Sequence, residues 1–476
     1  MNRIRAAAVL LSAALAGATA ASAQRFDALQ PSVRTFVRVS EPVVALTNVR
    51  VIDGTGAAPR DGQTIVIENG QIAAVGPAAQ VRAPAGARVL DLAGHTVIPG
   101  LVGLHDHTFY TTPRRRVQSN FTAPRLYLAS GVTTIRTTGS ASPYDELNLK
   151  RTVEEGAAPG PRMFITGPYI TGEGAGGQMY AATTPEDARR VVSYWVDEGV
   201  NWFKFYTSIS RDAMRAAIEE AHRRGAKFTG HLCSVGFREA VALGIDNLEH
   251  GFLTNSEYTP GKKPDECPQN MSEGLEAVDL AGPEVQATFR EMVARGVSMT
   301  STPAVFELFV RDRPPLDPRL AEAMSPEAHA EYVQSRRDII ANPQWGIPEA
   351  LFKKALAYDL AFVRAGGLLA AGVDPTGSGG ALPGFGDQRN YELLVEAGFT
   401  PTEAVRVMTL NGARILGIER ETGSIERGKR ADLVVIEGDP VARAGDIRNV
   451  RIVFKEGVGY DSARLIAAVK GQVGIR

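Results

Sequence analysis

Short stretches with the apolar, β-branched character of strands occur near both ends of the chain. Between residues 43 and 97 they alternate with turns, and Asn69-Gly70 between two of them is a strong hairpin signal. A second β-rich block lies between residues 431 and 454. Neither block has enough strands for a stable domain alone, so we expect one small β-sandwich built from residues 24–97 and 415–476.

Residues 98–414 show a different pattern, in which short apolar runs alternate with amphipathic stretches of helical length. This alternation predicts an α/β fold with a parallel sheet, and eight units favour a distorted TIM (β/α)8 barrel. A doubly wound open sheet is the alternative, but no Gly-rich phosphate loop follows the first strand. The expected strands centre on residues 97–107, 132–138, 162–170, 202–207, 227–232, 247–251, 298–303 and 368–374.

Two polar or proline-rich stretches interrupt this alternating pattern, near residues 254–279 and 310–348. Loops of this length in a compact domain are commonly functional. We therefore interpret both stretches as long loops that act as lids or covers.

Residues 1–23 have the three parts of a secretory signal peptide. Arg3 and Arg5 precede an apolar stretch too short to span a bilayer, and Ala21-Ser22-Ala23 is a typical cleavage pattern. A short N-terminal helix is the alternative. We expect cleavage near Ala23, a periplasmic or secreted location and no membrane anchor. Such a compartment would allow Cys233 and Cys267 to form a disulfide, although the sequence does not give their distance.

The overall composition excludes several classes of protein. The 476 residues carry 52 Lys and Arg against 53 Asp and Glu, a net charge of −1, so we expect no nucleic-acid partner. Apolar residues make up 44% of the chain, which excludes predominant disorder. Two cysteines cannot form a zinc site of four thiolates, and with only seven histidines their positions become informative.

His105-Asp106-His107 at the end of the first predicted barrel strand is the strongest local signal. Alternation along a strand places His105 and His107 on one face, where two imidazoles can bind one metal ion. Four more predicted strand ends carry a titratable residue. Each alone is readily explained as a satisfied core residue, but six ligand-type residues at five strand ends indicate an active site. The four are Lys204, His231, His250 and Asp374.

These residues, with the preceding Pro99-Gly100-Leu101, resemble the metal-dependent amidohydrolase superfamily. Residues 408–414 and 423–433 are similar to the closing segment of that family. Within it, the chain resembles the branch of imidazolonepropionase-like proteins and metal-dependent Xaa-Pro dipeptidases and carboxypeptidases. The resemblance covers nearly all of the mature chain and independently implies a distorted barrel with an appended β-sandwich.

The resemblance implies two divalent metal ions, for which zinc, manganese and cobalt are candidates and zinc is preferred. His105, His107 and Asp374 would bind one ion, and His231 and His250 the other. Lys204 would bridge both as a carbamate, which explains a lysine in an apolar strand. A hydroxide between the metals would attack the substrate, with Asp374 as general base and then as proton donor to the leaving amine.

The expected reaction is cleavage of an amide bond in a small molecule such as a dipeptide or an N-acyl amino acid. The same ligands would also serve a lactone, a carbamate or a phosphotriester. A mononuclear deaminase is disfavoured because no acid follows His231 until Glu239. A binding protein with a vestigial site is a further alternative, and a homo-oligomer is compatible with the sequence.

Two residues are predicted to contact the substrate. Tyr206 shares a strand face with Lys204 and would bind the substrate or polarise the scissile carbonyl, unless it is a core aromatic. Arg136 ends the second predicted strand and would bind a substrate carboxylate, although Thr137 stands where relatives tend to carry Asp. The neighbouring Arg114-Arg115-Arg116 is better explained as a solvated loop than as a guide for an acidic group.

Overall fold

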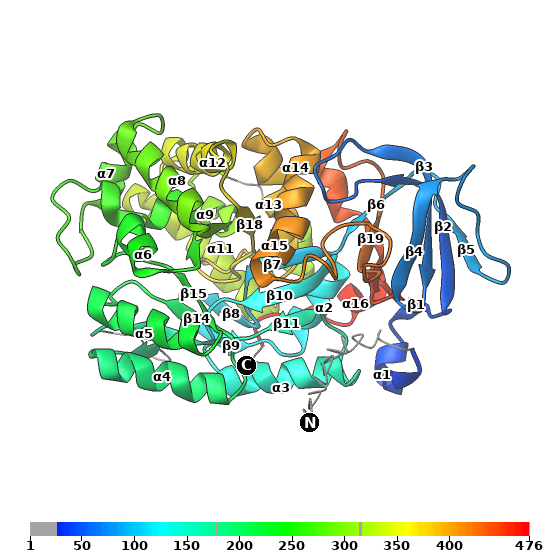
Figure 1. Cartoon of the computed structure of the whole chain (residues 1–476), viewed down its shortest axis with the longest axis horizontal. Coiled ribbons are helices and arrows are strands. Elements are labelled where there is room, and N and C mark those ends of the chain that lie inside the picture. The colour runs from blue at the N-terminus through cyan, green and yellow to red at the C-terminus, as the bar shows by residue number, and fades with distance from the viewer. Residues whose placement is uncertain (1–25, 175, 177–178, 314–316, 476) are drawn as a thin grey trace, which may run out of the picture.

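The computed structural model describes residues 26–174, 176, 179–313 and 317–475. The predicted signal peptide lies outside these residues. Both ends of the chain contribute strands to one nine-stranded sheet, on the right in Figure 1. Its strands are β1 (Val37–Val39), β2 (Val43–Val51), β3 (Arg60–Glu68), β4 (Gln71–Pro77), β5 (Arg88–Asp91), β6 (His95–Pro99), β19 (Leu433–Glu437), β20 (Val450–Lys455) and β21 (Val458–Asp461).

The two ends of the chain meet where β6 pairs antiparallel with β19. The order β1-β21-β20-β19-β6-β2-β3-β4, with β5 on β2, joins all nine strands into one sheet rather than two separate ones. Asn69 and Gly70 both have positive φ at the β3–β4 turn, as the hairpin signal predicted. Apolar side chains such as Leu46, Ile65 and Phe454 form the core of this sheet.

Apart from β13, which pairs with the outer side of β12, the parallel strands of the central region follow one another in chain order. They form three sheets, β11-β10-β7, β13-β12-β14-β15 and β16-β17-β18, so strand pairing does not close a complete barrel. The third predicted strand is split in two at Ile165. These strands are β7 (Leu101–Asp106), β10 (Val132–Thr137), β11 (Arg162–Phe164), β12 (Thr166–Thr171), β13 (Met179–Ala181), β14 (Trp202–Phe205), β15 (Lys227–Gly230), β16 (Asn247–Glu249), β17 (Ser298–Ser301) and β18 (Leu369–Ala371).

Helices alternate with these strands and flank them (Figure 1). Their apolar side chains share one core with those of the strands. The longer helices carry the amphipathic pattern seen in the sequence, and several begin at a proline preceded by a capping residue. The helices are α1 (Pro31–Arg34), α2 (Thr122–Ala129), α3 (Pro143–Glu154), α4 (Pro185–Asp197), α5 (Arg211–Arg223), α6 (Phe237–Leu243), α7 (Met271–Ala277), α8 (Pro283–Arg295), α9 (Pro303–Glu307), α10 (Pro318–Ala323), α11 (Pro326–Ala341), α12 (Glu349–Arg364), α13 (Phe385–Glu396), α14 (Pro401–Arg406), α15 (Gly412–Leu416) and α16 (Ser462–Ala467).

The sheet domain and the first parallel strand are directly connected. Only Gly100 separates β6 from β7, and a Cβ at this position would lie 2.1 Å from Thr133 Oγ1. Any side chain here would therefore displace β10. Glycine is required for this close passage between the two parts of the fold.

The second interrupting stretch is mostly helical, so its interpretation as a long loop was wrong. Within residues 310–348, α10 and α11 begin at Pro318 and Pro326, and the side chains of Asp317 and Ser325 cap them. Proline at the first helical position needs no hydrogen bond and starts a helix rather than breaking it. Prolines that suggested a loop thus mark helix starts.

The first interrupting stretch is covalently attached to the parallel strands. Cys267, at the exposed surface of this stretch, forms a disulfide with buried Cys233, two residues beyond His231, with 4.9 Å between the Cα atoms. The pairing that the sequence left open is therefore present. Among the described residues, no helix has the length and apolar character needed to cross a membrane.

Replacing Cys267 with Ser should destabilise the protein because the bond closes a loop with a sequence separation of 34 residues. The disulfide lowers the entropy of the unfolded chain, and its removal should lower the free energy of unfolding by about 3–4 kcal/mol. Denaturant unfolding of the oxidised protein, the variant and the protein treated with a reductant measures this difference. Equal unfolding midpoints for all three would contradict it.

Candidate metal centre

The six predicted ligand-type residues meet at the carboxyl ends of the parallel strands. This is the edge at which parallel α/β folds place their chemistry, because side chains from successive strands converge there. His105 lies in β7 and His107 just after it, Lys204 lies in β14, His231 and His250 follow β15 and β16, and Asp374 lies three residues beyond β18.

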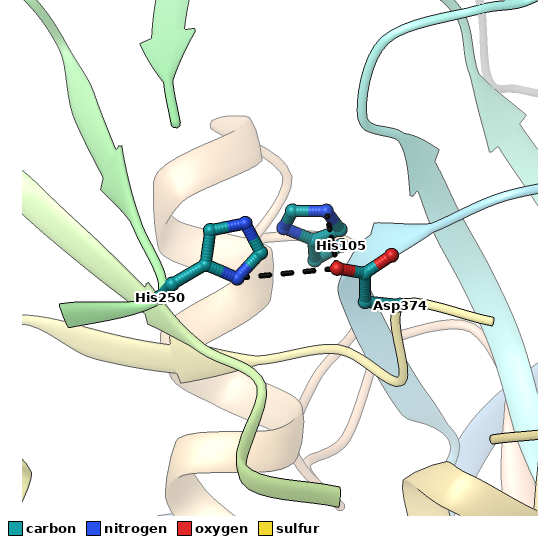
Figure 2. A group of neighbouring side chains, drawn as sticks. All are labelled: His105, His250 and Asp374. Atoms are coloured by element: carbon teal, nitrogen blue, oxygen red, sulfur yellow. Dashed lines mark ion pairs between the residues drawn. The ribbon is translucent and has the colours of Figure 1, made fainter. Parts of the chain in front are cut away.

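Asp374 is the common neighbour of three imidazoles. Its Oδ2 atom lies 3.5 Å from His105 Nε2 and 4.0 Å from His250 Nδ1, while Oδ1 lies 3.5 Å from His107 Nε2. Figure 2 shows His105 and His250 directed toward the Asp374 carboxylate. One ligand atom from each of these three residues lies within 4.8 Å of the others, close enough for one metal ion. Although burial opposes ionisation, the imidazoles hold the pKa of Asp374 well below its usual value.

Lys204 and His231 complete the cluster from neighbouring strands. Lys204 is 2% exposed, and its Nζ atom lies 3.1 Å from His105 Nε2. Burial lowers the pKa of Lys204 to about 8. The His231 ring lies 4.4 Å from the His250 ring and 4.8 Å from the Tyr206 ring, measured between centroids. Tyr206 therefore lies beside the cluster, as its shared strand face with Lys204 suggested.

Two of the ligand-type residues have unusual backbone conformations. His250 has φ 66° and Asp374 has φ 47°, both in the left-handed region that non-glycine residues rarely adopt. Hydrogen bonds from His250 N to Thr300 O and from Asp374 N to His105 O, both 2.8 Å, hold these positions. Such strained residues persist where the surrounding structure fixes them, commonly at functional sites.

Glu249, which the sequence analysis did not single out, orients His105. Its Oε2 atom lies 2.7 Å from His105 Nδ1, which leaves Nε2 directed at Asp374 and Lys204. A carboxylate behind a metal-binding imidazole fixes the ring and raises its basicity. The sequence could have indicated this role. Burying an acidic side chain at a strand end, directly before His250, costs free energy unless the carboxylate has a partner.

Arg136 is not at a position to bind a substrate carboxylate, so that expectation was wrong. The side chain is completely buried, and its Nη2 atom donates to Glu249 Oε1 and to Leu104 O, each at 2.5 Å. Although burial opposes ionisation of Glu249, the charges of Arg136 and His105 hold the pKa of Glu249 at about 2. Arg136 therefore neutralises the carboxylate that positions His105.

The residues present fit a divalent metal ion. Burial lowers the pKa of His107 to about 4 and that of His231 to about 3, so both imidazoles are neutral at neutral pH and have a lone pair to donate. Within the described residues, His250 Nε2 and His107 Nδ1 are buried without a hydrogen-bond partner. Imidazoles with a carboxylate form a donor set that suits zinc and related ions.

Comparison with known proteins gives matches along most of the chain. A dihydroorotase of Pelotomaculum thermopropionicum is 26% identical over 406 residues, covering 79% of this chain and 84% of that protein. A 5-methylthioadenosine/S-adenosylhomocysteine deaminase of Moorella thermoacetica is 36% identical over 111 residues, covering 21% of this chain and 26% of the deaminase. The structure of a Bifidobacterium longum protein described as a candidate prolidase is similar with a TM-score of 0.66 and 27% identity, covering 90% of this chain and 98% of that one.

The sequence profile of the amidohydrolase family matches residues 96–459. This range is more than half of the chain and contains every residue of the candidate metal centre. It also includes the strands β19 and β20 and the first half of β21, which return to the nine-stranded sheet. Because the match spans both the parallel strands that carry the site and this returning sheet, the chain belongs to the amidohydrolase family and is a metal-dependent hydrolytic enzyme.

Proposed function

We propose that this enzyme uses two divalent metal ions, preferentially zinc, to cleave an amide bond in a dipeptide or an N-acyl amino acid. The observation that carries the proposal is the contact between Lys204 Nζ and His105 Nε2 at 3.1 Å inside a cluster of imidazoles. The similarity to a candidate prolidase supports a peptide-type bond as the target. We further propose that the three parallel sheets form the wall of a distorted barrel around this site. The single nine-stranded sheet beside it would fold on itself as a β-sandwich domain.

In this proposal, Lys204 would help to hold both metal ions as a carbamate. A buried ammonium beside imidazoles would repel a metal ion, whereas a carbamate would supply anionic oxygens. The neutral Nζ atom forms a bond to the carbon of carbon dioxide and releases one proton. His105, His107 and Asp374 would then hold one metal with this carbamate, and His231 and His250 would hold the other.

Asp374 moves the proton in the proposed reaction. Hydrolysis forms a C–O bond to water and breaks the C–N bond, so one proton must pass from water to the leaving nitrogen. The ionised Asp374 carboxylate accepts this proton at Oδ2 and donates it to the amine. When bound, the metal ions supply Lewis-acid activation of the water and of the substrate carbonyl. We assign contact with the carbonyl end of the substrate to Tyr206, whose ring lies beside that of His231.

A deaminase reaction has less support. Glu239, the first acid after His231, lies on α6, where it accepts a hydrogen bond from Gly236 N and pairs with Arg211. The Glu239 carboxylate is engaged in these two contacts, and neither partner belongs to the metal centre. The same ligands would serve a lactone, a carbamate or a phosphotriester, which only a substrate comparison separates.

Export from the cytoplasm is part of the proposal. The Cys233–Cys267 disulfide supports it, because structural disulfides form and persist mainly in oxidising compartments. The signal peptide over residues 1–23 and the periplasmic or secreted location stay predictions. The disulfide supports them only indirectly, through the compartment that it indicates.

We predict that the metal-loaded enzyme cleaves members of a panel of dipeptides and N-acyl amino acids. Lactones, carbamates, phosphotriesters and adenosine derivatives, tested in parallel, should be cleaved or deaminated at least about 100-fold more slowly in kcat/KM. Release of amine or ammonia is followed for each compound. Absence of amide cleavage, with turnover of another class, would refute the proposal.

We predict that Lys204→Ala lowers kcat more than about 100-fold, because even partners of metal ligands are worth 10–100-fold. Metal analysis should find two ions per chain in the wild type and fewer in the variant. Reconstitution of wild-type apoenzyme should require bicarbonate, and a short carboxylate such as acetate should partly restore the variant. Lys227→Ala, at the start of the adjacent strand, is the control and should behave as wild type. Full activity and metal content in Lys204→Ala would exclude the carbamate.

We predict that Glu249→Gln lowers metal affinity by about 10- to 100-fold and destabilises the protein by about 3–5 kcal/mol, because Arg136 is left buried and unpaired. Competition with a chelator and thermal unfolding measure the two effects. Adding Arg136→Met should restore stability but not metal affinity, and exposed Glu219→Gln is the control. Unchanged metal affinity in Glu249→Gln would show that Glu249 only balances charge.

A further inference from the structure

The β8–β9 hairpin, β8 (Phe109–Thr112) and β9 (Arg115–Gln118), follows the metal-binding motif directly and has two distinct faces. Thr111 pairs with Arg116 in the antiparallel register, so Phe109, Thr111, Arg116 and Gln118 share one face. Phe109 on this face stacks on the His107 ring, with 4.4 Å between centroids. This face is therefore the one directed at the metal centre.

The opposite face of the hairpin is fixed to the rest of the protein. Arg115 binds Glu331 of α11 through two nitrogens, and its Nη1 atom donates to Gly474 O. Thr112 Oγ1 donates to the same carboxylate at 2.7 Å. Tyr110 Oη donates to Gly379 O, five residues beyond Asp374. These contacts hold the hairpin rigidly, so the side chains of the other face are presented in a defined position.

Arg116 is exposed on the face directed at the metal centre. Its guanidinium carbon lies 5.6 Å from the centroid of the Phe109 ring, in a cation–π arrangement. The same Phe109 ring stacks on the His107 ring, so Phe109 links Arg116 to the metal centre. The guanidinium therefore lies at the rim of the site rather than in a remote solvated loop.

We propose that Arg116 binds the free carboxylate of the substrate and selects compounds in which a carboxylate lies near the scissile amide. This inference rests on the proposed amide cleavage and names the group that the enzyme reads. The planar guanidinium matches a carboxylate with two parallel hydrogen bonds. Arg136 cannot take this role, because it is buried and bound to Glu249. A substrate carboxylate at Arg116 orients the amide toward Asp374.

The test compares the best compound of the amide panel with its own C-terminal carboxamide. In the wild type, the free carboxylate should be preferred by about 30-fold in kcat/KM, the range of a hydrogen-bonded charge. Arg116→Gln should reduce this preference to a few-fold, mainly by raising KM for the acid. Arg116→Lys should keep part of the preference, because it retains the charge without the planar fork. Arg114→Gln, on the same hairpin, is the control and should keep it all.

Two results would overturn the inference. One is equal use of the acid and the carboxamide by the wild type, and the other is an unchanged preference in Arg116→Gln. In either case amide cleavage itself would stand, so the proposed function would survive. If no panel compound is cleaved by the metal-loaded wild type, the proposed function fails and this inference fails with it.

Discussion

The buried carboxylate of Glu249 is the interaction on which the site depends. One of its oxygens lies against His105 Nδ1 and the other accepts from Arg136, with Thr229 Oγ1 as a further donor. An ionised carboxylate without such partners would cost several kcal/mol in this interior. Because these partners come from β7, β10 and β15, the charge network also fixes the relative positions of the strands that carry the ligands.

The same network explains how a cluster of imidazoles can be kept neutral and ready for a metal. Desolvation depresses the pKa values of His107 and His231. Although burial opposes ionisation, the pKa of Asp374 is held well below its usual value, with a hydrogen bond to His107 among the causes. The neutral bases and the anion are thereby held at atom separations that a metal ion can close, with little rearrangement of the backbone.

The three consecutive arginines after the metal motif show how context separates identical side chains. Arg115 is fixed by Glu331 and by the carbonyl of Gly474, near the C-terminus of the chain. Arg116, one residue on, lies over Phe109 on the opposite face. Arg114 lines a cavity of about 230 Å³ with Phe309 and Trp345. Strand alternation alone places Arg115 and Arg116 on opposite faces of the hairpin. The packing of α11 against Arg115 decides which of these faces turns toward the metal centre.

Much of the fold was readable from the sequence, because it depends on local patterns. The Asn69-Gly70 hairpin, the alternating strands and helices and the sheet built from both chain ends follow from periodicity and turn chemistry. The helices at Pro318 and Pro326 were missed because proline either starts or stops a helix, depending on its neighbours. The splitting of the parallel strands into three sheets depends on pairing across the structure, which no local pattern specifies.

For the site, the sequence by itself determined the candidate ligands, because these residues fall at the ends of five predicted strands, where parallel strands converge. They are His105, His107, Lys204, His231, His250 and Asp374. It did not determine what each polar neighbour contacts. Arg136 was assigned to the substrate, yet the structure pairs it with Glu249, and the cysteine pairing was decided only by the approach of Cys267 to Cys233. A residue's type and spacing fix what chemistry it can perform, whereas its partners are set by contacts between segments far apart in the chain.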